Sequence, residues 1–144
     1  MVVGTRAFIE KGRVYRKMFG GGMRQAGVIA AAGLIALEKS PGRLHIDHEN
    51  ARRLAEGIAQ IRGLRIDPAK VRSNIVIFDC SGIGKTAVEL CEMLHRRGIW
   101  AQDTALYSVR LVTHVDVNRE GIERALVVLA EVAAEASGVK AAAR

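Results

Sequence analysis

The apolar residues of the chain fall into segments whose spacing predicts helices and short strands. Near the front, a helix is predicted over residues 6–17, where apolar positions recur at helical intervals among basic ones. A second helix, over residues 26–37, has no polar face, so it should be buried on all sides. Pro41 and Gly42 then interrupt the chain and mark a boundary between two parts.

Behind this boundary the pattern predicts a helix, two strands, a helix, two strands and a helix. The predicted helices cover residues 43–61, 85–97 and 119–136, and the predicted strands cover 64–66, 73–79, 99–101 and 107–112. The strand at 73–79 has a continuous apolar centre, which predicts burial on both of its faces. Helices and strands mixed at this density predict an α/β domain, in which a small sheet carries helices packed on one face.

Three parts are therefore expected: residues 1–40 as a piece of a larger domain, residues 41–136 as a small α/β domain, and residues 137–144 as a tail. The apolar helix over 26–37 is too short to span a bilayer, which takes about 20 apolar residues. It needs other protein around it, and the few elements before Pro41 cannot cover it. We therefore expect the chain to self-associate.

Composition and charge narrow the class of protein. The chain is 49% hydrophobic and 26% charged, which is ordinary globular usage, and no run reaches membrane-spanning length, so a soluble cytoplasmic protein is expected. Cys80 and Cys91 indicate neither a disulfide scaffold nor a zinc site. The formal charge is +7, and basic residues gather near the front. One hypothesis is accordingly a non-catalytic basic module that contacts nucleic acid or an acidic partner, although aromatic residues for base stacking are few.

The glycines at positions 20–22 lie between basic residues. Lys17 precedes them, and Arg24 is expected in the first turn of the following helix. Backbone N–H groups at a helix N-terminus together with cations suit an anion. A flexible glycine loop with solvated charges is the alternative.

Two further patterns imitate binding sites. Residues 82–86 resemble a phosphate-binding loop, but Asp79 stands where that motif requires glycine, so an ordinary turn from strand to helix is expected. His45 and His48 have the spacing of neighbours on a helix, but no third ligand is near in sequence. No metal site is expected.

The late strand carries an arginine among apolar residues. Arg110 is either paired, reserved for a ligand, or an edge arginine in water, and its planar guanidinium suits a carboxylate. His114 and Asp116, two positions apart, have the spacing of residues on one side of a strand, so they could be a base with its orienting carboxylate, or a structural pair.

Two runs resemble one family. KMFGGGMRQAGVIAAAGLIALE, residues 17–38, looks like the segment after the cofactor lysine in low-specificity L-threonine aldolases, which are fold-type I pyridoxal-phosphate lyases. RLVTHVDV, residues 110–117, resembles that family's late strand, and the likeness extends from Val2 to about Ala134. In the family a Ser-Lys pair that carries the cofactor lies shortly upstream of the position of Val2. The resemblance therefore implies the C-terminal portion of such a lyase, without that lysine.

The resemblance also implies roles for residues. Arg110 would hold the α-carboxylate of the substrate, and Lys17 and Arg24 would lie near pyridoxal phosphate, where neighbouring subunits meet. No catalytic residue is expected within the chain itself. Residues 1–40 would be the end of the large cofactor domain. The complete family members are oligomers, typically tetramers, and cleave β-hydroxy amino acids such as threonine and allo-threonine to glycine and an aldehyde. The chain alone is expected to be inactive without the missing N-terminal half.

Overall fold

The computed structural model describes residues 1–138. It divides into two compact units, Met1–Arg43 and Leu44–Arg144. The assignment of residues 1–40 to a cofactor domain and of 41–136 to a small domain stays a prediction. Of the tail expected over 137–144, the part from residue 139 lies outside the described residues.

The first unit contains two helices joined by the glycine turn. Helix α1 (Arg6–Met18) begins after Thr5, whose side chain accepts a hydrogen bond from the Phe8 N–H, a local cap that sequence can encode. Helix α2 (Gly27–Lys39) begins later than expected. Gln25 has a positive φ of 48°, a left-handed conformation that a right-handed helix cannot include. Arg24 therefore precedes α2, and the expectation that it lies in the first turn is wrong.

Helix α2 is exposed along its length in this structure. It has no buried residue, and Val28 is 80% exposed. Burial on all sides is thus not provided by the described residues of the chain. A helix without a polar face needs protein on all sides to be buried. The first unit has only α1 and two short connections, which are too few to cover α2.

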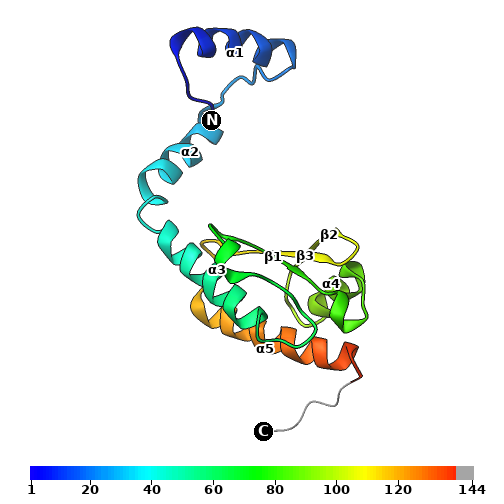
Figure 1. The fold of residues 1–144 in the computed structure, drawn as a ribbon. Coiled ribbons are helices and arrows are strands. Elements are labelled where there is room, and N and C mark those ends of the chain that lie inside the picture. The colour runs from blue at the N-terminus through cyan, green and yellow to red at the C-terminus, as the bar shows by residue number, and fades with distance from the viewer. Residues whose placement is uncertain (139–144) are drawn as a thin grey trace. The chain divides into compact units, whose positions relative to one another are not determined.

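The second unit is a three-stranded antiparallel sheet with helices on one face. Its helices are α3 (Leu44–Ile58), α4 (Ala87–His95) and α5 (Arg119–Ala136), with short 3-10 turns η1 (Pro68–Lys70) and η2 (Ser81–Ile83). The strands β1 (Ile75–Asp79), β2 (Gln102–Ala105) and β3 (Ser108–Val112) lie in the order β1-β3-β2. Figure 1 shows α5 beneath the strands. The predicted α/β arrangement, with a small sheet and helices packed on one face, is confirmed.

The core lies between the sheet and the three helices. From the sheet, Val76, Phe78 and Val109 point into it, and each is almost completely buried. The helices contribute the apolar residues Leu54, Ile58, Leu90, Leu94, Ile122, Leu129 and Val132. Burying an aliphatic or aromatic side chain of this size contributes roughly 1.5–3 kcal/mol, so these contacts dominate the stability of the unit.

Two local expectations are corrected, for the strands predicted over 73–79 and 64–66. Strand β1 is buried on one face only, with Ile75 and Ile77 43% and 51% exposed, because the helices cover only the other side. Residues 64–66 form no strand, only a single bridge between Arg65 and Asp79. In α4, Val88 faces outward, and the buried residues are Ala87, Leu90 and Leu94.

The strand predicted over 99–101 is also wrong, and β2 begins at Gln102 instead. Gly98 has a φ of +78°, and the Ile99 N–H donates to the Leu94 carbonyl at 3.0 Å. This bond closes the C-terminal end of α4 in the manner of a glycine cap. The apolar triplet that imitates a strand therefore starts in the helix cap.

Two glycines meet where the loop after α3 passes η2. A Cβ atom added to Gly82 would lie 2.7 Å from the Gly63 carbonyl oxygen and 2.9 Å from its Cα. Gly63 itself has a φ of +88°. Since real Cβ atoms do not approach backbone this closely, both positions depend on the absence of a side chain.

Among residues 1–138, no helix combines the length and the apolar character that crossing a membrane requires.

Candidate functional site

The face of the sheet that the helices leave open carries Arg110. Because strand residues alternate between faces, Val109 and Leu111 point into the core while Arg110 points to the opposite side. The register places Arg110 opposite Ile77 of β1 and opposite Gln102 of β2. The guanidinium therefore lies on a partly apolar surface in the middle of the sheet.

Within the described residues, Arg110 forms no ion pair. Its Nη2 donates to the Gln102 side-chain oxygen, and its Nε is buried without a hydrogen-bond partner. Arg110 is half-buried, so it is not a fully solvated edge arginine. It is also not paired with an acid of residues 1–138. An unneutralised guanidinium beside apolar side chains is chemically suited to an external carboxylate. The carboxylate role stays a prediction.

The cationic residues expected near the cofactor lie in the first unit, whereas Arg110 lies in the second. Lys17 is in the last turn of α1, and Arg24 is in the turn before α2. A Cβ atom on Gly22 would lie 3.2 Å from the Lys17 ammonium nitrogen, so this glycine leaves space beside the charge. Both cations are exposed. Their proposed roles also stay predictions.

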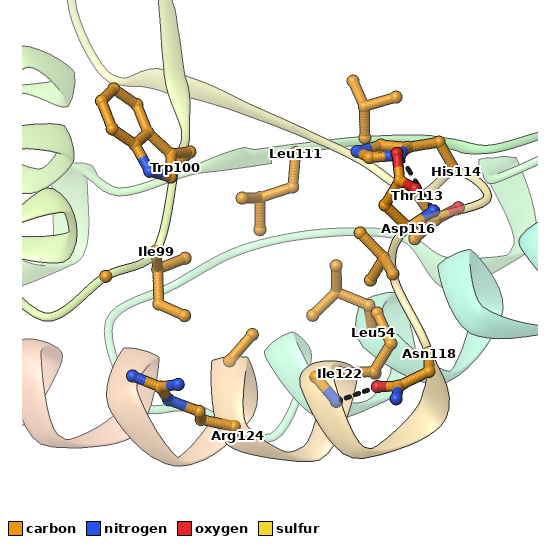
Figure 2. A pocket seen from close by; sticks show the side chains of 15 residues that line it. Leu54, Ile99, Trp100, Leu111, Thr113, His114, Asp116, Asn118, Ile122 and Arg124 are labelled. Atoms are coloured by element: carbon orange, nitrogen blue, oxygen red, sulfur yellow. Dashed lines mark hydrogen bonds and ion pairs between the residues drawn. The ribbon is translucent and has the colours of Figure 1, made fainter.

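His114 and Asp116 line a pocket of about 310 Å³ on the helical side of the sheet (Figure 2). The pocket lies between the end of β3, the segment after α4 and the start of α5, and Leu54, Leu111 and Ile122 supply apolar walls. Trp100 stands at its rim, 76% exposed, with its ring 3.7 Å from that of His95. Arg110 is not part of this pocket.

The His114–Asp116 pair is real but differs from the expected arrangement. His114 Nδ1 lies 3.4 Å from an Asp116 carboxylate oxygen, and it also accepts from the Asp116 N–H at 3.3 Å. Both residues belong to the turn after β3, not to the strand, because β3 ends at Val112. Both side chains are mostly exposed. The contact is therefore a pair that stabilises the turn and is open to solvent.

The segment that imitates a phosphate-binding loop is a turn from strand to helix. The Asp79 carboxylate accepts from the Ser81 hydroxyl at 2.6 Å and from the Ser81 N–H at 3.0 Å, and Arg65 lies 3.2 Å away. These bonds, that of the Ser81 hydroxyl above all, lower the pKa of Asp79 below its ordinary value. One oxygen of the carboxylate, Oδ1, is therefore engaged in holding the turn.

The lysine of the same segment is also engaged. Lys85 pairs with Glu89 at 3.2 Å, and Thr86 and Glu89 form a reciprocal capping box at the start of α4. The Thr86 N–H bond is the largest cause of the lowered pKa of Glu89. The interpretation as an ordinary turn is thus the one that the structure supports. No group of three metal-ligating side chains occurs in the part of the chain that the structure describes.

Gln102, the neighbour of Arg110, is absent from the residues that the sequence pattern singled out. The sequence pattern contains little indication of its role, because polar residues are common in short exposed strands. Only the pairing of β2 with β3 reveals that it contacts the arginine.

Comparison with known proteins shows the family of this chain. A model of the beta-eliminating lyase family matches residues 1–81, more than half of the 144 residues. The chain belongs to the beta-eliminating lyase family. The matched residues include the first of the two sequence runs, residues 17–38.

Individual relatives agree with the family assignment. The chain is 39% identical over 127 residues to a probable low-specificity L-threonine aldolase 2 of Arabidopsis thaliana, covering 88% of this chain and 36% of that protein. It is likewise 39% identical over 134 residues to the low specificity L-threonine aldolase of Escherichia coli K12, covering 93% of this chain and 36% of the relative. The chain thus spans about a third of the length of these relatives.

Proposed function

We propose that this chain is the C-terminal portion of a threonine aldolase-like lyase and that Arg110 holds the α-carboxylate of a β-hydroxy amino acid. The single observation that carries the proposal is the position of Arg110: central on the open face of the sheet and without an acidic partner among residues 1–138. The similarity to low-specificity L-threonine aldolases supports the substrate class, threonine or allo-threonine cleaved to glycine and an aldehyde.

The physical contribution of Arg110 is capture and orientation. A guanidinium presents parallel N–H groups that match the two oxygens of a carboxylate. Ile77, opposite Arg110 on the neighbouring strand, has no acidic group that would compete with the substrate carboxylate. Fixing the carboxylate fixes the Cα atom, and this positioning reduces the entropy cost of reaching the bond-breaking geometry.

The proposed cofactor is pyridoxal phosphate, which when bound supplies an electron sink for breaking the Cα–Cβ bond. The residues of this chain that suit the cofactor are those that suit its phosphate group. Gly22 leaves room beside the Lys17 ammonium, and Arg24 adds a second exposed cation in the same unit. Such donors suit a phosphate dianion. Lys17 and Arg24 would hold it, in the complete enzyme where subunits meet.

A chain of these 144 residues alone is expected to give no retro-aldol turnover. Covalent catalysis by lysine relies on a desolvated or otherwise activated amine. Of the lysines within residues 1–138, Lys11, Lys17, Lys39 and Lys70 are exposed, and Lys85 is paired with Glu89. The measurement is glycine formed from L-threonine with added pyridoxal phosphate, followed by borohydride trapping and mass spectrometry. A pyridoxyl adduct at one specific lysine, together with glycine formation, would contradict this prediction.

Self-association through α2 is the second expectation about the isolated chain. Ile29, Leu34 and Ile35 are exposed on this helix, and contiguous apolar surfaces of this kind mark interfaces or aggregation sites. Sedimentation at tens of micromolar, a range in which exposed apolar surface drives assembly, should show an oligomer or a poorly soluble chain.

The matched variants decide whether α2 is the cause. Ile35→Glu should shift the chain toward smaller species, whereas Val127→Glu, which charges an exposed apolar position on α5, should not. A monodisperse wild-type monomer at this concentration would contradict the expectation.

A further inference from the structure

Gln102 and Arg110 are neighbours across two strands of the open sheet face. The register of β2 and β3 sets their Cα atoms opposite each other, and the Arg110 Nη2 donates to the Gln102 side-chain oxygen. Cross-strand partners lie close enough for their side chains to interact directly. The contact therefore follows from strand pairing and is not a chance meeting of two long surface side chains.

The remaining donors of Arg110 differ in their access. Nε is buried and has no acceptor in the part of the chain that the structure describes. Gln102 accepts a hydrogen bond from Nη2, whereas Nη1 has no partner within residues 1–138 and is not buried. An incoming carboxylate can therefore reach the outer end of the guanidinium, at Nη1 and the second N–H of Nη2, but not the side that contains Nε.

The residue at position 102 is neutral, and this property matters. A glutamine oxygen fixes the guanidinium without cancelling its charge, whereas a carboxylate at the same place would form an ion pair and compete with the substrate. On the other side, Ile77 offers no acceptor that could draw the guanidinium away. The arginine is thus held from one side by a neutral acceptor only.

We infer that Gln102 is a positioning residue, which fixes the Arg110 guanidinium with its outer edge directed toward the substrate carboxylate. This inference rests on the proposed function of Arg110 and adds the residue that prepares it for binding. It assigns to β2, a strand whose residues are all exposed, a part in substrate recognition.

Two variants of similar side-chain size separate positioning from charge. Gln102→Met removes the acceptor, and Gln102→Glu keeps an acceptor but adds a charge. Thr104→Ala is the matched control, because Thr104 lies on the same strand but bonds to Ser108 and not to Arg110. Circular dichroism melting of the full chain checks that all three variants fold.

The first readout is rotation of the Arg110 guanidinium, followed by NMR of the arginine-labelled full chain. Wild type, Thr104→Ala and Gln102→Glu should show resolved Nη resonances, because the bond at Nη2 hinders rotation. In Gln102→Met these resonances should merge. Unchanged resonances in Gln102→Met would overturn the inference, whatever the role of Arg110.

The second readout is a titration with sodium acetate as the carboxylate probe. Gln102→Met should weaken acetate binding about three- to tenfold, the effect of having to immobilise one long side chain on binding. Gln102→Glu should weaken acetate binding at least as much, although it still hinders rotation of the guanidinium. A merely structural role would not give this combination of hindered rotation and weakened binding. Binding unchanged in both variants would overturn the inference. If instead Arg110→Lys binds acetate as well as wild type, the proposed function of Arg110 fails, and the rotation readout still decides whether Gln102 holds the arginine.

Discussion

Arg110→Lys, in a full-length lyase that contains this chain, is expected to lower kcat/KM for L-threonine by about ten- to a few-hundred-fold. The lysine keeps the charge but loses the planar two-point fit to the carboxylate. A hydrogen bond to a charged group contributes roughly 1.5–3 kcal/mol, and each 1.36 kcal/mol is about tenfold in rate. The absorbance of the bound cofactor should be nearly unchanged, because in the proposed role Arg110 binds the substrate and not the cofactor.

The control is Arg62→Lys, an exposed arginine elsewhere in the same unit, which should leave kcat/KM unaltered. Two results would contradict the role assigned to Arg110: an intact kcat/KM in Arg110→Lys, or a loss of cofactor absorbance without a specific loss of substrate use.

Gly82→Ala is expected to destabilise the second unit by about 3 kcal/mol, the upper end of the usual cost of overpacking. The added methyl would meet the Gly63 carbonyl oxygen at 2.7 Å, and backbone cannot rotate away as a side chain can. Urea unfolding followed by the fluorescence of Trp100, the one tryptophan of the chain, measures the free energy of unfolding.

Gly84→Ala is the comparison variant for this experiment. Gly84 has a φ of +70° but no atom within 4 Å of an added Cβ, so its substitution costs only the left-handed conformation, about 1–2 kcal/mol. If Gly82→Ala were no more destabilising than Gly84→Ala, the close approach of the two loops would not be a determinant of stability.

Sequence predicted best those elements whose ends are encoded locally. Thr5 and Asn118 cap α1 and α5 through bonds to residues three positions on, so these helices begin where the pattern predicted. The small sheet with helices on one face was predictable for another reason. Its helices are amphipathic over several turns, which indicates that each has one buried side.

The errors arose where distant residues decide the outcome. The apolar run of β1 gives no indication that only one of its faces is covered, because coverage depends on where the three helices pack. Arg110 could be singled out from its apolar neighbours, but its contact with Gln102 depends on the pairing of β2 with β3, which short-range patterns do not specify. For α2, the all-apolar pattern predicts burial, whereas within residues 1–138 the helix is exposed.

The central place of β3 in the sheet has a consequence for biosynthesis. Neither β1 nor β2 has a partner in this sheet until β3 has been made, because β3 lies between them. Helix α3, which packs on β1, likewise lacks its helical partner α5 until the end of the second unit has been made. The second unit therefore cannot fold progressively as the polypeptide leaves the ribosome. It must fold late and nearly all at once, and until then its apolar strands are exposed to chaperones and to neighbouring nascent chains.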